Sequence, residues 1–95
     1  MVVGVLRVYA HLYEPMSLKD KRRILKSVLA KVQNKFNVSA AEVDWQDHLR
    51  KTELGFSFVS NAPGHADSMM NAVVQYLESS PEYEITDVST EIIHI

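Results

Sequence analysis

The sequence contains no cysteine, which excludes disulfides, thiolate nucleophiles and cysteine-based zinc or iron–sulfur sites. Only histidine and carboxylate side chains remain as potential metal ligands. The sequence also lacks a hydrophobic run of membrane-spanning length. Its apolar start, Val2–Leu6, is interrupted by Arg7 and predicts a strand rather than a signal peptide or a membrane span. These absences are typical of a cytoplasmic protein, and we expect that location, with no membrane partner.

Basic residues are absent from the last 44 residues of the chain. Up to and including Lys51 the sequence carries ten basic and five acidic residues, a net charge of +5; beyond it come seven acidic and no basic residues, a net charge of −7. Seven of the ten basic residues lie between Lys19 and Lys35. A basic patch on an otherwise acidic protein predicts that one surface meets a polyanion while the rest is repelled.

Length and composition set the scale of the fold. With 95 residues, of which 46% are hydrophobic, the chain can build one core but not two, so a single domain spanning residues 1–95 is expected. The isoelectric point near 6.0 is too low for a protein that coats nucleic acid over its whole surface. Any such binding must therefore come from the local basic patch.

Residues 2–13 alternate between the two sides of a predicted half-buried strand. One side carries Val2, Leu6, Val8, Ala10 and Leu12, and the other carries Arg7, Tyr9, His11 and Tyr13. Pro15 ends this strand, and Ser17, followed three residues later by Asp20, has the pattern of a helix N-cap. A helix is expected from about Leu18 to Phe36. Its predicted apolar stripe consists of Leu18, Leu25, Val28, Leu29, Val32 and Phe36.

The remaining pattern predicts two strands, a helix and a final strand. The second and third strands are expected at Asn37–Asp47 and Thr52–Ser60, as an antiparallel hairpin. Asn61 is the predicted N-cap of the second helix and Pro63 one of its first residues. The fourth strand is expected at Ile85–Ile95. This order predicts an α+β, ferredoxin-like βαββαβ plait, in which two helices cover one face of a four-stranded antiparallel sheet.

Four basic residues share one flank of the first predicted helix: Lys19, Arg22, Arg23 and Lys26. Lysine and arginine bind phosphates without strict geometric demands, so this flank is a candidate RNA-binding site whose affinity should fall steeply with salt. The competing interpretation is a solvated helix face without a partner, because both residue types are ordinary exposed helix formers. We expect no sequence-specific recognition of DNA.

Lys21 falls beside the apolar stripe of the same helix, near Leu18 and Leu25. An ammonium group in that position needs a carboxylate partner or a route to water. We expect Lys21 to pair with Glu42 or Asp44 and so to fix the helix against the second strand.

The third predicted strand contains Gly55-Phe56-Ser57-Phe58, which overlaps the aromatic signature of RNA-recognition motifs. Leu54 stands where that signature requires a basic residue. Because Leu54, Phe56 and Phe58 share one side of the strand, we expect both phenylalanines in the core rather than at a base-stacking site.

Glu42, Asp44 and Gln46 alternate onto one side of the second predicted strand, with His48 just beyond and His11 as a further potential ligand. Their spacing is not diagnostic of a metal ion, and a solvated hairpin face is the favoured interpretation. The sequence shows no Ser-His-Asp order, no glycine-rich phosphate loop and no nucleophile with an adjacent base. We therefore expect no catalytic residues, no metal, no cofactor and no enzymatic activity.

The predicted open face of the sheet carries aromatic side chains with polar tips. Tyr9 and Tyr13 lie on it by the alternation of the first strand, and Trp45 can lie on either side. Such side chains are common in protein interfaces. A homodimer through Tyr9, Tyr13 and Trp45 is therefore the alternative to RNA binding, and an amphipathic face without a partner competes with both.

Three separated segments agree in order and spacing with one known family. They are Ser17-Leu18-Lys19-Asp20-Lys21-Arg22-Arg23, then Phe36-Asn37-Val38-Ser39-Ala40-Ala41-Glu42-Val43-Asp44, then Leu54-Gly55 with Val59-Ser60-Asn61. In these segments the sequence resembles the DUF503 family, also called YlxP-like proteins, over nearly the whole chain. The family's Asp-x-Gln-Asp run is present as Asp44-Trp45-Gln46-Asp47.

The resemblance implies a small bacterial ferredoxin-like protein. In some bacteria such proteins are encoded beside translation-initiation and ribosome-binding factors, which implies an action on ribosomes or RNA but gives no mechanism. Combined with the charge pattern, this predicts a non-enzymatic accessory factor whose partner is a ribosomal subunit or its rRNA. The basic flank at Lys19, Arg22, Arg23 and Lys26 would contact the phosphates.

Overall fold

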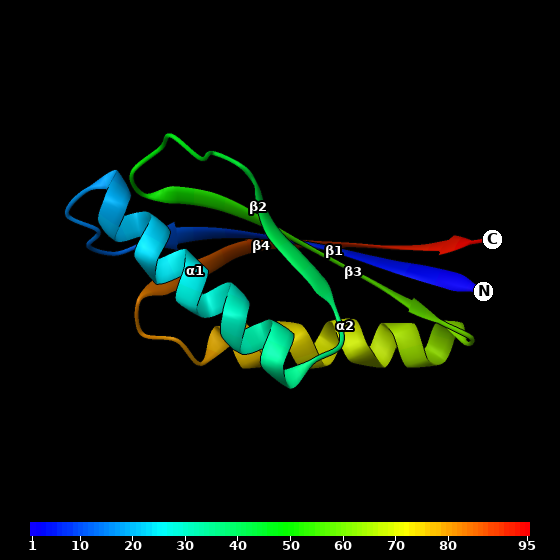
Figure 1. Ribbon diagram of the computed structural model, residues 1–95. Helices are drawn as coiled ribbons and strands as arrows, with labels where there is room; N and C mark the ends of the chain where they lie inside the picture. Colours follow the sequence, from blue (N-terminus) through cyan, green and yellow to red (C-terminus); the bar gives the residue numbers. More distant parts are fainter.

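The computed structural model describes all residues, Met1–Ile95, and confirms the predicted ferredoxin-like order (Figure 1). The elements are β1 (Val2–Leu12), α1 (Leu18–Lys35), β2 (Ser39–Asp44), β3 (Lys51–Ser60), α2 (Pro63–Glu78) and β4 (Tyr83–His94). Neither helix is both long and apolar enough to cross a membrane.

The four strands form one antiparallel sheet in the order β2-β3-β1-β4. The first strand of the chain therefore lies in the interior of the sheet, where Val8 pairs with Leu54 of β3 and with Val88 of β4. Two irregularities interrupt this ladder. One lies in β4 opposite Tyr9 and Ala10, and the other in β2 between Glu42 and Asp44.

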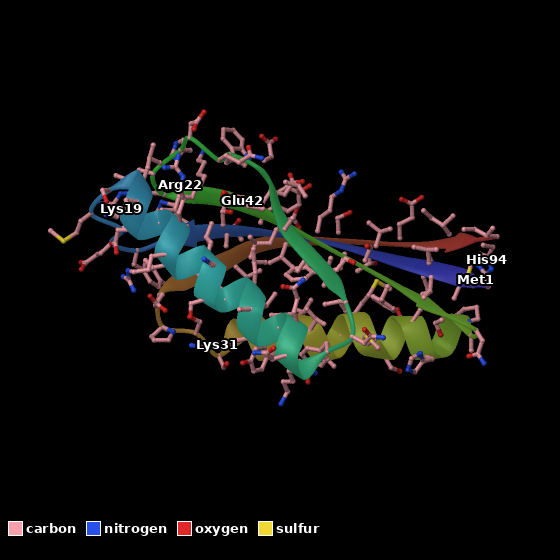
Figure 2. All side chains as sticks on the ribbon, viewed as in Figure 1. Met1, Lys19, Arg22, Lys31, Glu42 and His94 are labelled. Carbon is pink, nitrogen blue, oxygen red and sulfur yellow. The ribbon has the colours of Figure 1, made fainter.

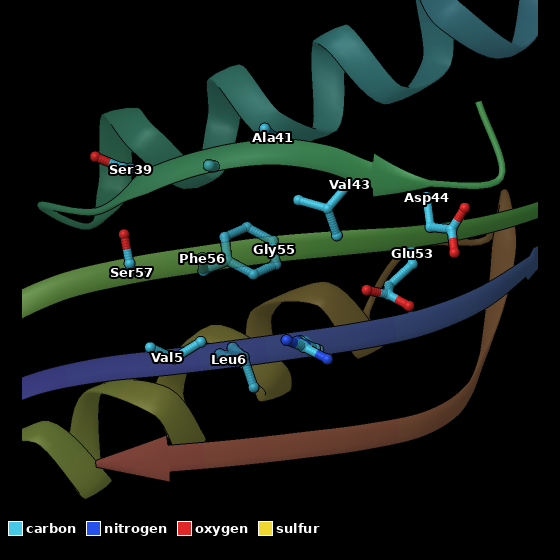
Figure 3. A pocket seen from close by; sticks show the side chains of 12 residues that line it. Val5, Leu6, Ser39, Ala41, Val43, Asp44, Glu53, Gly55, Phe56 and Ser57 are labelled. Atoms are coloured by element: carbon cyan, nitrogen blue, oxygen red, sulfur yellow. The ribbon is translucent and has the colours of Figure 1, made fainter. Parts of the chain in front are cut away.

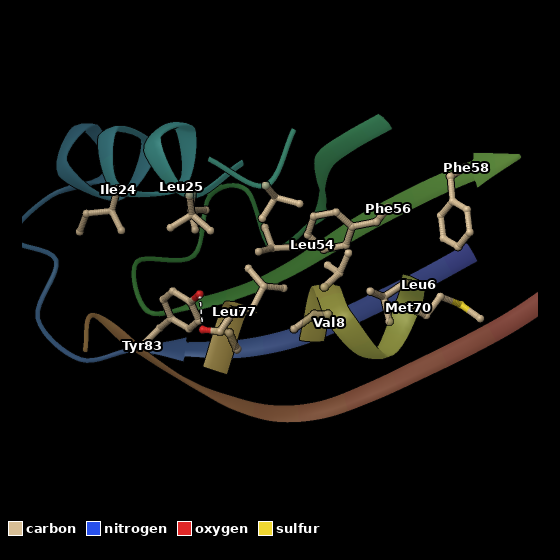
Figure 4. Packing of buried hydrophobic residues seen from close by; sticks show 14 of the residues in the cluster. Leu6, Val8, Ile24, Leu25, Leu54, Phe56, Phe58, Met70, Leu77 and Tyr83 are labelled. Carbon is tan, nitrogen blue, oxygen red and sulfur yellow. Dashed lines mark hydrogen bonds between the residues drawn. The ribbon is translucent and has the colours of Figure 1, made fainter. Parts of the chain in front are cut away.

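The core lies between the sheet and the two helices (Figure 4). The apolar side of β1 is buried as predicted, and Leu6, Val8 and Leu12 have no exposed surface. Phe56 and Phe58 are only 2% and 7% exposed, which confirms that they belong to the core. Burial of each phenylalanine contributes about 1.5–3 kcal/mol, so these rings cannot serve as an exposed stacking surface.

Helix α1 begins where its sequence predicts. The Ser17 hydroxyl accepts from the Asp20 N–H at 3.0 Å, which satisfies one of the free amide groups of the first turn. The Asp20 carboxylate accepts in turn from the Met16 N–H at 3.1 Å. Of the predicted apolar stripe, Leu25, Val28 and Val32 are in the core and Leu29 and Phe36 pack against it partly buried, whereas Leu18 is not part of it. Ile24 joins the core, and Lys21 is buried beside it.

Two sequence predictions about element boundaries were wrong. The second strand is shorter than Asn37–Asp47, because β2 ends at Asp44 and Trp45 takes a left-handed backbone conformation with φ 65°. The N-cap of α2 is Ala62 rather than Asn61, and its methyl side chain makes no capping hydrogen bond. The Ser60 hydroxyl accepts from the Ala62 N–H instead, at 3.1 Å.

Candidate nucleic-acid interface

The four basic residues predicted on α1 are all exposed, and they lie near one end of the elongated molecule. Figure 2 shows Lys19 and Arg22 at this end and Met1 and His94 at the other. The molecule measures 42 Å along its longest axis, against 21 and 20 Å across. The Tyr13 N–H donates to the Glu82 carbonyl and Glu84 pairs with His11 in the sheet, so acidic residues of the last 44 also lie at this end. The charge separation along the sequence is therefore only partly a separation in space.

Two of the four are engaged by carboxylates of their own chain. Arg23 Nη2 lies 2.6 Å from Asp20 Oδ1, and this hydrogen bond lowers the pKa of Asp20 and raises that of Arg23. Arg22 Nη2 lies 4.0 Å from Asp47 Oδ1, with both side chains largely exposed, so this pair is weak. Neither Lys19 nor Lys26 forms an ion pair within the molecule.

Lys21 of α1 binds β2 and the segment between β2 and β3 at this end of the molecule. The prediction that it pairs with Glu42 or Asp44 is confirmed for Glu42, whose Oε2 lies 3.0 Å from Lys21 Nζ. Three backbone carbonyls also accept from the ammonium group: those of Trp45 at 2.6 Å, His48 at 2.6 Å and Lys51 at 2.8 Å. The side chain has no exposed surface, so these acceptors replace the water that a lysine normally retains.

The carbonyls that Lys21 binds belong to one segment, residues 45–51, which we call the Lys21-held loop. Within it the His48 N–H donates to the Trp45 carbonyl at 2.9 Å. His48 Nδ1 accepts from the backbone N–H groups of Arg50 at 3.2 Å and Lys51 at 3.1 Å. The loop is therefore fixed both by its own hydrogen bonds and by the buried ammonium group.

We call the end of the molecule that carries Lys19, Arg22, Arg23 and Lys26 the basic end. The Lys21-held loop adds two cations to it that sequence reasoning did not include in the site. Arg50 donates through Nη1 to the Tyr13 carbonyl, and the Lys51 ammonium lies 5.1 Å from the centroid of the Trp45 ring. Neither cation forms an ion pair with a carboxylate of the chain. The only sequence signal for this extension was the apolar position of Lys21, which required acceptors from a distant segment.

The predicted aromatic interface is only partly assembled. Tyr9 and Trp45 line one depression of about 300 Å³, together with residues that include His11 and Lys51. Tyr13 lies outside this depression, in the connection between β1 and α1, and is 48% exposed. The structure thus brings together two of the three residues of the predicted interface.

A larger depression, of about 520 Å³, lies on the sheet over β1, β3 and β2 (Figure 3). Within its lining, Val43 lies so close to Gly55 that a Cβ atom at Gly55 would lie 2.8 Å from Val43 Cγ1. Its charged lining residues are Arg7, Asp44 and Glu53. No group of three or more histidine and carboxylate side chains is placed to hold a metal ion here or elsewhere.

The fold is shared with solved structures that are distant in sequence. A de novo designed protein with a ferredoxin fold superposes with a TM-score of 0.63 at 15% identity, over 95% of this chain and 85% of its own. The structured domain of Drosophila melanogaster Boca superposes with a TM-score of 0.55 at 13% identity, over 92% and 95% of the two chains. These similarities establish a ferredoxin-like fold and carry no information about function.

Sequence comparison gives the family. Residues 3–90 match the family described as "Protein of unknown function (DUF503)". The "Uncharacterized protein YlxP" of Bacillus subtilis (strain 168) is 37% identical over 90 residues, which cover 95% of this chain and 98% of that protein. The chain belongs to the DUF503 family, as its sequence segments predicted.

Proposed function

We propose that this protein is a non-enzymatic, RNA-binding accessory factor that docks its basic end on the phosphates of ribosomal RNA. The observation that carries the proposal is the concentration of cations without carboxylate partners at one end of the molecule. They are Lys19 and Lys26 of α1 and Arg50 and Lys51 at the start of β3. Arg22 and Arg23, whose ion pairs are exposed, can exchange their carboxylates for phosphates.

The acidic remainder of the chain supports an oriented encounter. No basic residue follows Lys51, and Asp67 of α2 and Glu91 of β4 lie far from the basic end, so those parts would be repelled by a polyanion while α1 approaches it. The contacts would be made to phosphates, which fix position without reading sequence. The proposal therefore predicts strong salt dependence and little preference among RNA sequences.

The first test is sedimentation of a lysate from the native host through density gradients at low and high salt, with detection of this protein. Migration with one ribosomal subunit at low salt, lost at high salt, would support the proposal. A protein that stays at the top of both gradients would overturn the ribosomal assignment.

A charge-reversal experiment tests the site itself. The double change Arg22→Glu and Arg23→Glu should weaken binding to purified ribosomal RNA and reduce the slope of log K against log salt by about one to two. The matched control is Lys31→Glu with Lys35→Glu, an equal change in charge on another flank of the same helix. Equal losses in both variants would show that net charge, and not the basic end, governs binding.

A homodimer through the open face of the sheet is the second candidate function. It is favoured by an apolar row across that face, in which Val3 pairs with Val59 on one side and Ile93 on the other. Val59 is 64% exposed and Ile93 40% exposed. A dimer that persists at high salt and binds no RNA would support this function. The double change Tyr9→Ala and Tyr13→Ala should then dissociate it, and an intact dimer would remove both tyrosines from the interface.

A further inference from the structure

Trp45 combines two costly properties. Its backbone φ of 65° lies in the left-handed region, where a bulky residue is strained. The residue is 43% exposed, so a large part of the benefit of burying an indole is also lost. Neither property contributes to the core, which does not include Trp45. Strained and exposed residues of this kind persist where the surrounding structure holds them, and they concentrate at functional sites.

The surrounding structure does hold Trp45. Its carbonyl accepts from Lys21 Nζ at 2.6 Å and from the His48 N–H at 2.9 Å, and its own N–H donates to Asp44 Oδ1 at 2.7 Å. A buried ammonium group is costly unless acceptors surround it. Here the acceptors are carbonyls of the Lys21-held loop, so their hydrogen bonds to Lys21 fix a loop whose residues are mostly exposed. The hydrogen bond from Lys21 therefore holds the backbone of Trp45 where its indole lies at the surface.

The surroundings of the indole indicate what it could bind. Lys51 Nζ lies over one face of the indole, 5.1 Å from the ring centroid, which leaves the opposite face for a base. The ring of His48 meets the indole edge-on at 5.8 Å between centroids. Trp45 and Lys51 both line the depression that Tyr9 and His11 also line. An exposed aromatic ring beside an unpaired cation is the combination that binds single-stranded nucleic acid, because a base stacks on the ring while the cation contacts a phosphate.

We propose that Trp45 is a stacking platform for an unpaired base of single-stranded RNA, with Lys51 and Arg50 contacting the neighbouring phosphates and Lys21 acting as the positioning residue. This inference rests on the proposed function and narrows the RNA ligand to a single-stranded segment, because a duplex has no free base to stack. Duplex RNA would still be bound by the cations of α1, with no contribution from the indole.

Trp45 is the only tryptophan of the chain, so its fluorescence reports directly on this site. Titration of the whole protein with a short oligouridylate should quench the fluorescence, whereas a duplex RNA of the same charge should bind without comparable quenching. Affinities are measured in parallel by anisotropy of fluorophore-labelled RNA. Trp45→Ala should weaken oligouridylate binding by about tenfold or more and leave duplex binding unchanged, and Trp45→Phe should retain most of the affinity. The matched control is Tyr13→Ala, an exposed aromatic outside the depression.

Lys21→Met tests the positioning role, with circular dichroism as the check on folding. In a folded variant the indole should be more mobile, with lower fluorescence anisotropy before RNA is added, and oligouridylate affinity should fall toward that of Trp45→Ala. An indole as immobile as in the parent protein would remove Lys21 from this role. If the variant does not fold, the comparison of Trp45→Ala with Trp45→Phe still decides the platform itself.

The outcomes separate this inference from the proposed function. Salt-sensitive binding of both RNAs with no quenching and no effect of Trp45→Ala would overturn the platform and leave the basic-end proposal standing. Failure to bind either RNA would overturn both. If the protein is a dimer that Trp45→Ala dissociates, and oligouridylate does not quench the indole, Trp45 is a protein interface instead.

Discussion

At the scale of single residues, the close contact between Gly4 and Phe58 sets a limit on substitution. A Cβ atom at Gly4 would lie 2.5 Å from Phe58 Cζ, and the Phe58 ring cannot move away freely because it belongs to the packed core. Gly4→Ala should therefore lower the free energy of unfolding by about 1–3 kcal/mol, measured by urea denaturation. Gly64→Ala is the control, because nothing lies within 4 Å of its Cβ position.

The control Gly64→Ala lies in α2. It should be neutral or stabilise the protein by up to about 1 kcal/mol, since alanine is a better helix former than glycine. Equal stabilities for the two variants would mean that β1 and β3 can separate locally at Gly4 without loss.

A second residue-scale prediction concerns alkaline pH. The Tyr83 hydroxyl donates to the Leu77 carbonyl at 2.7 Å, and burial raises the pKa of Tyr83 to about 12. The folded protein thus favours the neutral phenol more strongly than the unfolded chain does, where the pKa is about 10. The stability from this group is complete below pH 10 and is lost as the pH rises through 12.

Ultraviolet titration of tyrosinate in Tyr83→Phe should lose the most alkaline transition, and denaturation curves should show a weaker loss of stability between about pH 10 and 12. An unchanged titration would show that Tyr83 ionises like the exposed tyrosines.

At the scale of elements, the two helices differ in how they begin. Ser17 caps α1 with its hydroxyl, whereas Ala62 has the extended backbone of an N-cap, with φ −142° and ψ 132°, but no side-chain acceptor. Ser17→Ala should cost about 0.5–2 kcal/mol, and Ala62→Ser should stabilise the protein by up to about 1 kcal/mol, both measured by chemical denaturation.

Ser27→Ala, at an exposed position inside α1, is the control for the serine-to-alanine change itself. It should be close to neutral, because alanine has the higher helix propensity. A loss at Ser27 equal to that at Ser17 would show that capping is not the cause.

The sequence predicted the order of elements, the buried side of β1 and the partner of Lys21, because side-chain periodicity and charge carry those signals. It did not predict the end of β2, and although a turn at residues 48–51 was expected, it did not predict that the carbonyls of the Lys21-held loop bind the ammonium group. The acceptors in that loop are backbone carbonyls, which every residue has, and the left-handed conformation of Trp45 has no signal in an Asp-Trp-Gln-Asp segment. Arg50 and Lys51 were absent from the predicted site because the sequence does not show that Lys21 holds this loop beside α1.

At the scale of the whole molecule, two acidic residues lie far from the basic end. Glu91 pairs with Val5, six residues along β1 from His11, and the strand rise makes that separation about 20 Å. Asp67 lies near the start of α2, which follows the Ser60 end of β3. These acidic side chains are beyond the reach of direct contacts at the basic end.

Neutralising them by Asp67→Asn and Glu91→Gln should therefore raise the rate of RNA association at low ionic strength and leave the dissociation rate unchanged. The gain should vanish near physiological salt, where charges are screened beyond about 8 Å. Stopped-flow measurements at several salt concentrations check this. A gain that is independent of salt would show that the two carboxylates lie close to the bound RNA.

The central position of β1 also constrains the folding pathway. The first strand of the chain must pair with β3 on one side and with the last strand on the other, and the Ile95 N–H donates to the Met1 carbonyl at 2.9 Å. These contacts have high sequence separation, which slows folding because distant segments must meet before they stabilise each other. During synthesis, β1 would keep one unpaired edge until β4 has left the ribosomal exit tunnel. The nascent chain would therefore carry an exposed edge of β1 until β4 is free to pair with it.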